Sequence, residues 1–263
     1  MAGIRLTKAL RTEYELLFNG CVVKSNRTAA VQRLVNRLLS NRARYQGVEK
    51  FSGVPWYFIA VIHNMESSQN FRRHLHNGDS LTARTVHVPT GRPKNGTPPF
   101  TWEFSAADAL AYERLGDKSD WSLAGVLHNI EGYNGWGYRR FHPQTLSPYL
   151  WGYSNHYISG KYVKDGLWSD TAVSDQCGAA VLLRRMAELG QVTLVPKPAP
   201  GPSVPSYSNT KSSHPAVVAQ VVALQTWLNT FPHIFIREDG VPGRRTSDAY
   251  KQATGRYLPG DPG

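Results

Sequence analysis

The segment from Pro55 to Glu66, PWYFIAVIHNME, constrains the fold of this chain more than any other. It is apolar nearly all round, so a helix formed there must be covered by other elements on every side. Pro55 suits the first turn of a helix, because the amide hydrogen that proline lacks has no partner at that position. We therefore predict a central buried helix that ends at Glu66.

Amphipathic patterns predict further helices around this one, and the clearest is at 28–45, where aliphatic residues recur on one stripe. The other helices are expected at 105–116 with Ser105 as its cap and Gly116 as its stop, and at 119–130, 174–190 and 217–229. Residues 74–89 alone look like strand, with Asn77-Gly78 as a tight-turn pair. The expected fold class is mainly α, with one small β-hairpin beside the central helix.

The composition changes at Pro196. Between Pro196 and Pro215 the chain holds six prolines and little that could pack, which is typical of an extended, semi-rigid spacer. We therefore predict a larger domain at 1–195, a linker at 196–213 and a small helical module at 214–263, whose length is marginal for independent folding.

The charge balance favours acidic partners. The chain has 30 Lys and Arg against 19 Asp and Glu, a net charge of +11, which suits nucleic acid, an anionic membrane or the bacterial envelope. No nucleic-acid-binding or P-loop motif is present, and no apolar run is long enough to span a membrane. Cys21 and Cys177 are too few for a disulfide scaffold or a zinc ribbon, so both are predicted to be free core thiols.

Glu66 is unusual because it ends an apolar helix. The negative end of the helix dipole and the apolar neighbours both oppose ionisation, so the pKa of this carboxyl should rise toward the range of a general acid. Asp79 follows the expected Asn-Gly turn. Two carboxylates on either side of a cleft are the minimum needed to hydrolyse a glycosidic bond.

The run around Glu66, IHNMESSQNF, resembles the catalytic helix of goose-type lysozymes and soluble lytic transglycosylases. The stretch IEGYNGWGYRR, which begins at Ile130, is similar to the AYNAG element of that superfamily. The longer run VPWYFIAVIHNMESSQNFRRHLHNGDSL looks like the lysozyme-like proteins of phage endolysins. The resemblance covers roughly residues 10 to 190.

The resemblance implies a lysozyme-like fold and an enzyme that cleaves the β-1,4 bonds of peptidoglycan glycan strands. Glu66 would donate the proton and Asp79 would activate water, with no metal and no cofactor. The residues expected to contact the sugar are Tyr133, Asn134, Tyr138, His74 and Thr85. Such an endolysin would be a monomer made in the host cytoplasm without a signal peptide, would act at the cell wall, and would neither bind nucleic acid nor insert stably into a membrane.

Several alternatives stay open. Glu131 is the rival to Asp79 as the second carboxylate. The GLMQ stretch of transglycosylases is absent after Glu66, but an anhydro product on the same substrate is possible. A zinc peptidase is disfavoured, because no second histidine follows His63 at the i+4 spacing. The rival from another class is a wall-binding or tail-associated protein that keeps an inactive lysozyme fold.

The C-terminal segment resembles the peptidoglycan-binding repeat, which combines an LQ..LN helix with DG..G..T..A. The matching residues are Leu224, Gln225, Leu228, Asn229, Asp239, Gly240, Gly243, Thr246 and Ala249. The Phe-Gln pair that should follow is replaced by YKQATGRY. Cell-wall binding is the expected role, and a helical appendage packed on the main domain is the alternative.

Overall fold

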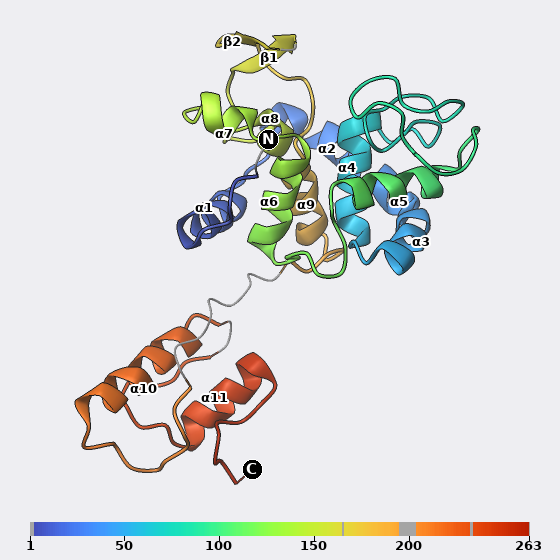
Figure 1. Ribbon diagram of the computed structural model, residues 1–263. Coiled ribbons are helices and arrows are strands. Elements are labelled where there is room, and N and C mark those ends of the chain that lie inside the picture. The colour runs from blue at the N-terminus through green and yellow to red at the C-terminus, as the bar shows by residue number, and fades with distance from the viewer. Residues whose placement is uncertain (1–2, 165, 195–203, 232–233, 263) are drawn as a thin grey trace. The chain divides into compact units, whose positions relative to one another are not determined.

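The computed structural model describes residues 3–164, 166–194, 204–231 and 234–262. The chain forms two compact units, Met1–Lys197 and Pro198–Gly263. Both are built mainly from helices (Figure 1). Within the described residues no helix has the length and apolar character needed to cross a bilayer.

The first unit is a set of helices joined by long loops, with one small sheet. Its helices are α1 (Lys8–Asn19), α2 (Thr28–Ser40), α3 (Arg42–Ser52), α4 (Trp56–Ser67), α5 (Trp102–Tyr112), α6 (Leu123–Tyr133), α7 (Gly137–Phe141), α8 (Pro148–Trp151) and α9 (Ala179–Glu188). A single 3-10 turn, Ser25–Arg27, precedes α2. The sheet consists of β1 (Lys161–Lys164) and β2 (Leu167–Ser169), paired antiparallel with Tyr162 opposite Trp168.

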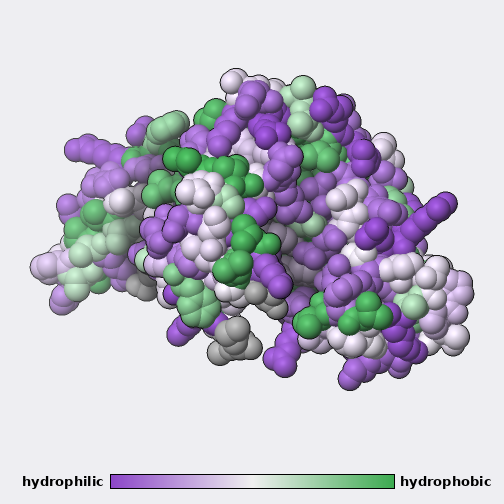
Figure 2. All heavy atoms as spheres, turned by 90° about the horizontal axis from the view of Figure 1, so that it is seen from above, coloured by the Kyte–Doolittle hydropathy of each residue, from purple (hydrophilic) through white to green (hydrophobic). Residues whose placement is uncertain are grey.

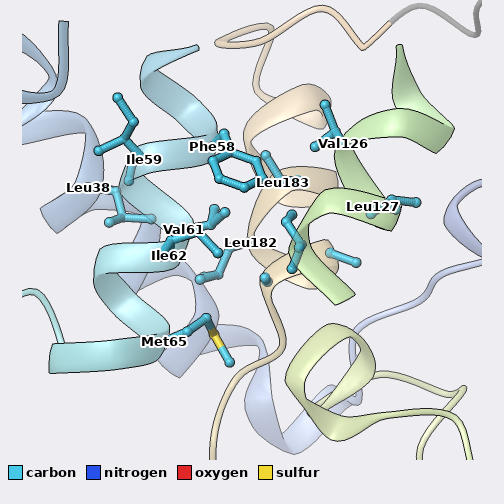
Figure 3. Packing of buried hydrophobic residues seen from close by; sticks show 14 of the residues in the cluster. Leu38, Phe58, Ile59, Val61, Ile62, Met65, Val126, Leu127, Leu182 and Leu183 are labelled. Atoms are coloured by element: carbon cyan, nitrogen blue, oxygen red, sulfur yellow. The ribbon is translucent and has the colours of Figure 1, made fainter. Parts of the chain in front are cut away.

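Helix α4 is the centre of this unit, as the sequence predicted. Its residues from Phe58 to Met65 are all buried, and α3, α6 and α9 pack around it. Figure 3 shows Phe58, Val61 and Met65 of α4 among side chains of the neighbouring helices. A helix covered on all sides gives its last turn a fixed position, which matters for the residue that ends it.

The helix boundaries differ from the predictions where a local polar group decides them. The segment 28–45 divides at Asn41 into α2 and α3. Helix α5 starts at Trp102 rather than Ser105, because the Thr101 hydroxyl accepts the Phe104 amide hydrogen and caps it.

Helices α6 and α9 start later than predicted, and α1 was not predicted. The Ser122 hydroxyl caps α6 by accepting the Gly125 amide hydrogen. Helix α9 begins only at Ala179, because the preceding residues run as a loop in which Gly178 packs against the Leu150 carbonyl.

The hairpin predicted at 74–89 is wrong. Within 74–89 the structure has no strand, and one isolated antiparallel bridge joins Arg73 to Ser80. The Asp79 carboxylate accepts the amide hydrogens of Val86 and His87, so this segment folds into a loop held by a side chain. The observed hairpin, β1–β2, is made of two very short strands with little period-2 signal.

The second unit is built on α10 (Pro215–Leu228) and α11 (Arg244–Thr254). Its core is a separate cluster of buried residues, namely Leu224, Leu228, Ile234, Ala249 and Leu258. The unit begins before residue 214, because the Tyr207 amide donates to the Pro259 carbonyl and the Ser208 amide to the Pro242 carbonyl. Of the predicted linker, residues 196–203 lie outside the described residues.

Both cysteines are free and buried, as predicted. Burial raises the pKa of the Cys21 thiol to about 11 and that of Cys177 to about 12. A thiol with so high a pKa is not a nucleophile near neutral pH.

Candidate active site

Glu66 lies in the last turn of α4, and the backbone that follows it is held in an uncommon conformation. Ser68 and Gln69 both have positive φ angles, 51° and 62°, which side-chain-bearing residues rarely adopt. The Gln69 side chain is fixed because its amide nitrogen donates to the side-chain oxygen Oδ1 of Asn64 at 2.8 Å. Gln176 donates to the Met65 carbonyl at 2.8 Å, so two amide side chains hold this helix end.

The loop after α4 approaches the helix end closely at Gly78. A side-chain carbon at this position would lie 2.5 Å from the Glu66 carbonyl oxygen, and the φ of Gly78 is +76°. Glycine is therefore required here both by the conformation and by the space. The loop from Asn70 to Phe100 is thereby seated against the end of α4.

The Glu66 carboxyl has one side-chain partner among the described residues. The Tyr149 hydroxyl, on α8, donates to its Oε1 at 2.6 Å. Burial raises the pKa of Glu66 to about 7, the Tyr149 hydrogen bond opposes that rise, and the negative charge of Glu113 adds to it. This carboxyl therefore keeps its proton to a higher pH than an ordinary glutamate does, and the tyrosine bond engages Oε1 and not Oε2.

Three surface hollows bear on the site, and Glu66 itself lines the first of them. The first, which we name the arginine hollow, has a volume of about 790 Å³ and is lined by Arg37 and by residues 66–73. The second, the Tyr149 groove, has a volume of about 710 Å³ and extends from Tyr149 to the β1–β2 hairpin. The third, the Tyr133 hollow, has a volume of about 810 Å³. Figure 2 views the end of the first unit that carries the hairpin and loops, where hydrophilic side chains dominate and apolar patches are separate.

The Tyr149 groove has an aromatic wall. The Tyr138 ring contacts the rings of Tyr162 and Trp168 edge to face, at 5.5 and 5.4 Å between centroids. His142 stacks on Trp168. Tyr138 and Tyr162 line the groove, and such aromatic faces suit the apolar face of a sugar ring.

Of the residues predicted to contact substrate, Tyr133, Asn134 and Tyr138 lie at these hollows. Asn134 is exposed and lines the Tyr149 groove together with Tyr138. Tyr133 lines the Tyr133 hollow, and its hydroxyl donates to the Leu75 carbonyl at 3.0 Å. Burial is the main cause that raises the pKa of Tyr133, and the negative charge of Glu66 raises it further. The two side chains therefore interact electrostatically.

His74 and Thr85 line none of these three hollows. The His74 ring is buried, with Nδ1 bonded to the Ser105 hydroxyl and Nε2 to the Ala83 carbonyl. The Thr85 hydroxyl is also buried, donates to the Pro89 carbonyl, and accepts the Arg92 amide hydrogen. Both side chains hold the loop between α4 and α5.

Asp79 is partly buried, and both of its carboxylate oxygens hold the loop. Its Oδ2 accepts the amide hydrogens of Val86 and His87 at 2.8 and 3.0 Å, and Oδ1 is bonded to the His87 ring at 2.7 Å. Burial tends to raise the pKa of Asp79, but the bonds from His87 and Val86 outweigh it and hold the pKa at about 2. The carboxylate is ionised at neutral pH, yet its acceptor positions are used to close the loop.

Glu131 is buried in an internal ion pair. Arg139 donates to its Oε2 at 2.9 Å, and the Tyr14 hydroxyl donates to the same oxygen. Arg139 also bonds Glu13 at 2.9 Å. This carboxylate has its counter-charge inside the protein, so it ties α6 to α1 and α7.

Glu113 was missed by sequence reasoning. It follows α5 directly as its C-cap and lines the Tyr133 hollow with Tyr133. Among the described residues its carboxylate has no hydrogen-bond or ion-pair partner, and burial raises its pKa. Its charge also raises the pKa values of Glu66 and Tyr149. It comes near Glu66 only in the folded chain, where α5 packs on α3 and α3 packs on α4, so no local sequence signal could have found it.

The histidines around Glu66 do not assemble a metal site. His63 is buried, its Nδ1 bonds the Tyr45 hydroxyl at 3.0 Å, and burial lowers its pKa to about 4. Within the described parts of the chain, no three His, Cys, Asp or Glu side chains are grouped so that they could hold a metal ion.

In the second unit, the residues of the C-terminal motif converge on Gln225. The Gln225 amide donates to Asp239, to the Val241 carbonyl and to the Thr246 hydroxyl, and its oxygen accepts the Gly240 amide hydrogen. Gly240 has a φ of +75°, and a side-chain carbon there would collide with Val218. These motif residues therefore hold the unit together.

Comparisons of the chain with protein-family models, with curated proteins and with solved structures gave no match.

Proposed function

We propose that the first unit cleaves the glycan strands of bacterial peptidoglycan, with Glu66 as the general acid. The observation that carries this proposal is a carboxyl with a pKa of about 7, held at a rigid helix end on a residue that lines a surface hollow. An acid that protonates a leaving glycosidic oxygen must keep its proton near neutral pH. The Tyr149 bond to Oε1 leaves Oε2 to carry that proton.

The adjoining grooves suit a polymer of sugars. The Tyr149 groove offers the aromatic faces of Tyr138 and Tyr162 together with the exposed amide of Asn134. Aromatic planes and amide groups are the complement of pyranose faces and hydroxyls. The Tyr149 groove and the Tyr133 hollow share the residues Gly137 and Phe141, so an extended substrate can lie along both.

The second carboxylate is better supplied by Glu113 than by Asp79 or Glu131. The oxygens of Asp79 are engaged by Val86 and His87, and Glu131 is paired with Arg139. A carboxylate that orients water needs a free acceptor position. Glu113 has one and faces a hollow that it shares with Tyr133.

The test is digestion of purified sacculi by the wild-type protein and by Glu66→Gln, with mass spectrometry of the released fragments. We expect cleavage only by the wild type. Reducing ends identify a hydrolase, whereas anhydro ends identify a transglycosylase, which needs only one carboxylate. No release by the wild-type protein contradicts the enzymatic proposal and favours the non-catalytic wall-binding alternative.

For the second unit we propose binding to the cell wall, which raises the local concentration of the enzyme on an insoluble substrate. Its own core and its Gln225 bonds support a unit that folds separately. A chain ending at Leu194 should keep its turnover on soluble glycan fragments and lose most of its activity on intact sacculi. Equal activity of both chains on sacculi would contradict a binding role.

A further inference from the structure

The arginine hollow carries positive charge that the protein itself does not neutralise. Arg37 of α2 and Arg72 and Arg73 of the following loop line it together with Glu66. Within the described residues none of these three guanidinium groups is paired with a carboxylate, whereas elsewhere in the unit Arg92 pairs with Asp108.

One of these arginines is held in place by the loop. The Arg73 Nη1 donates to the Gly78 carbonyl at 2.9 Å, in the segment where Gly78 contacts the end of α4. Arg37 reaches the hollow from a separate helix, and Arg72 is exposed on the rim. The loop conformation after Glu66 thus gathers cations from two parts of the chain beside one carboxyl.

Glu66 is the only acidic residue lining this hollow in the part of the chain that the structure describes. Because its pKa is about 7, its negative charge balances at most part of the charge of three guanidinium groups. Guanidinium groups bind carboxylates through paired, charge-assisted hydrogen bonds. A ligand that enters this hollow gains most if it is an anion.

We propose that the arginine hollow is a subsite for carboxylate groups carried by the glycan next to the bond that Glu66 cleaves. The inference rests on the proposed function and deepens it, because it separates peptidoglycan from neutral polymers. The muramyl sugar of peptidoglycan carries a short acidic side chain beside the glycosidic bond, whereas chitin carries none. Because Glu66 also lines this hollow, a carboxylate bound to its arginines would lie beside the proposed acid.

The test compares three soluble substrates of equal length: a muropeptide oligomer with free carboxylates, the same oligomer with its carboxylates amidated, and a neutral chito-oligosaccharide. We expect the wild-type protein to have the lowest KM for the first. Arg37→Gln or Arg72→Gln should raise that KM about tenfold, the loss expected for one charge-assisted hydrogen bond. Neither variant should change kcat, or KM for the amidated oligomer.

The matched control is Arg33→Gln, which removes the same charge from α2 at an exposed position that does not line the hollow. It should leave the KM for the carboxylate-bearing oligomer nearly unchanged. An equal effect of Arg33→Gln and Arg37→Gln would mean that only net charge matters, and this would overturn the subsite.

Binding to the Glu66→Gln variant, measured by calorimetry, separates this inference from the proposed function. If the wild type cleaves nothing but Glu66→Gln still binds the carboxylate-bearing oligomer about tenfold more tightly than the amidated one, the subsite stands without the activity. Equal affinity for the two oligomers overturns the subsite. So does equally tight binding of a short oligonucleotide, because it would show a general anion surface.

Discussion

Helices α4 and α6 both end beside a glutamate, and the two carboxylates have different hydrogen-bond partners. Glu66 borders an open hollow, has a tyrosine hydroxyl as its hydrogen-bond partner, and has a pKa of about 7. Glu131 is buried and bonded to both Arg139 and Tyr14. A buried carboxylate with a counter-charge forms a structural ion pair. A buried carboxylate without one has a raised pKa and can act as an acid. The two sites differ in their partners and not in their position on the helix.

The largest effect is expected from Glu66→Gln. If this residue is the general acid, the exchange should lower the rate by about 100-fold or more, because the proton donor is lost while the shape is kept. The measurement is fragment release from sacculi. A variant that keeps more than about a tenth of the wild-type rate would remove Glu66 from the mechanism.

Glu66→Gln should also change how the stability of the folded protein depends on pH. The carboxyl pKa is raised from 4.5 to about 7 in the folded protein, so the folded state keeps a proton that the unfolded state releases. Wild-type stability should therefore decline between pH 4.5 and about 7. Glu66→Gln lacks this decline, and its melting temperature should equal or exceed that of the wild type above pH 7.

The second effect in size is expected from Glu131→Gln, and it should be on stability alone. The exchange leaves the Arg139 guanidinium with Glu13 as its remaining carboxylate. Weakening a buried ion pair from one side typically costs about 3 kcal/mol. Urea unfolding measures this loss, and the rate per folded molecule should stay near that of the wild type. A rate loss as large as that of Glu66→Gln would restore Glu131 as a catalytic carboxylate.

A smaller effect is expected from Glu113→Gln. The rate should fall about tenfold, less than the roughly 100-fold or more typical of a group that transfers a proton itself, because Glu113 would only orient the water. Because the charge of Glu113 raises the pKa of Glu66, the loss of activity at alkaline pH should also move to lower pH. Glu103→Gln on the same helix, where the carboxylate is paired with Arg44, serves as the control and should change neither quantity.

Sequence reasoning could find α4 and Glu66, because both follow from local composition. An apolar run that ends on an acid predicts both a buried helix and an unsolvated carboxyl, and the structure agrees. It could not decide between Asp79 and Glu131 as the second carboxylate, since the Arg139 that pairs with Glu131 comes from another element. The lysozyme-like fold itself stays a prediction.

The failed hairpin at 74–89 has a related cause. The Asn-Gly turn is a local signal, and Gly78 does have the expected positive φ. The pairing beyond it was decided by Asp79, whose carboxylate takes the amide hydrogens that a strand would have used. The arginine side chains of α2 and of the loop after α4 likewise come near Glu66 only in the folded chain. Sequence patterns could therefore not predict the contacts between side chains that only the folded chain brings together.

The smallest effect is expected from the two tyrosines that bond the compared carboxylates. The Tyr149 hydroxyl lowers the pKa of Glu66, so Tyr149→Phe should raise that pKa. The acid then keeps its proton to higher pH, and the loss of activity at alkaline pH should move upward, opposite in sign to Glu113→Gln. Tyr14→Phe removes the equivalent bond to Glu131 and should lower the melting temperature without moving the pH profile. If both exchanges move the profile alike, the distinction between an acid and an ion pair at these two helix ends fails.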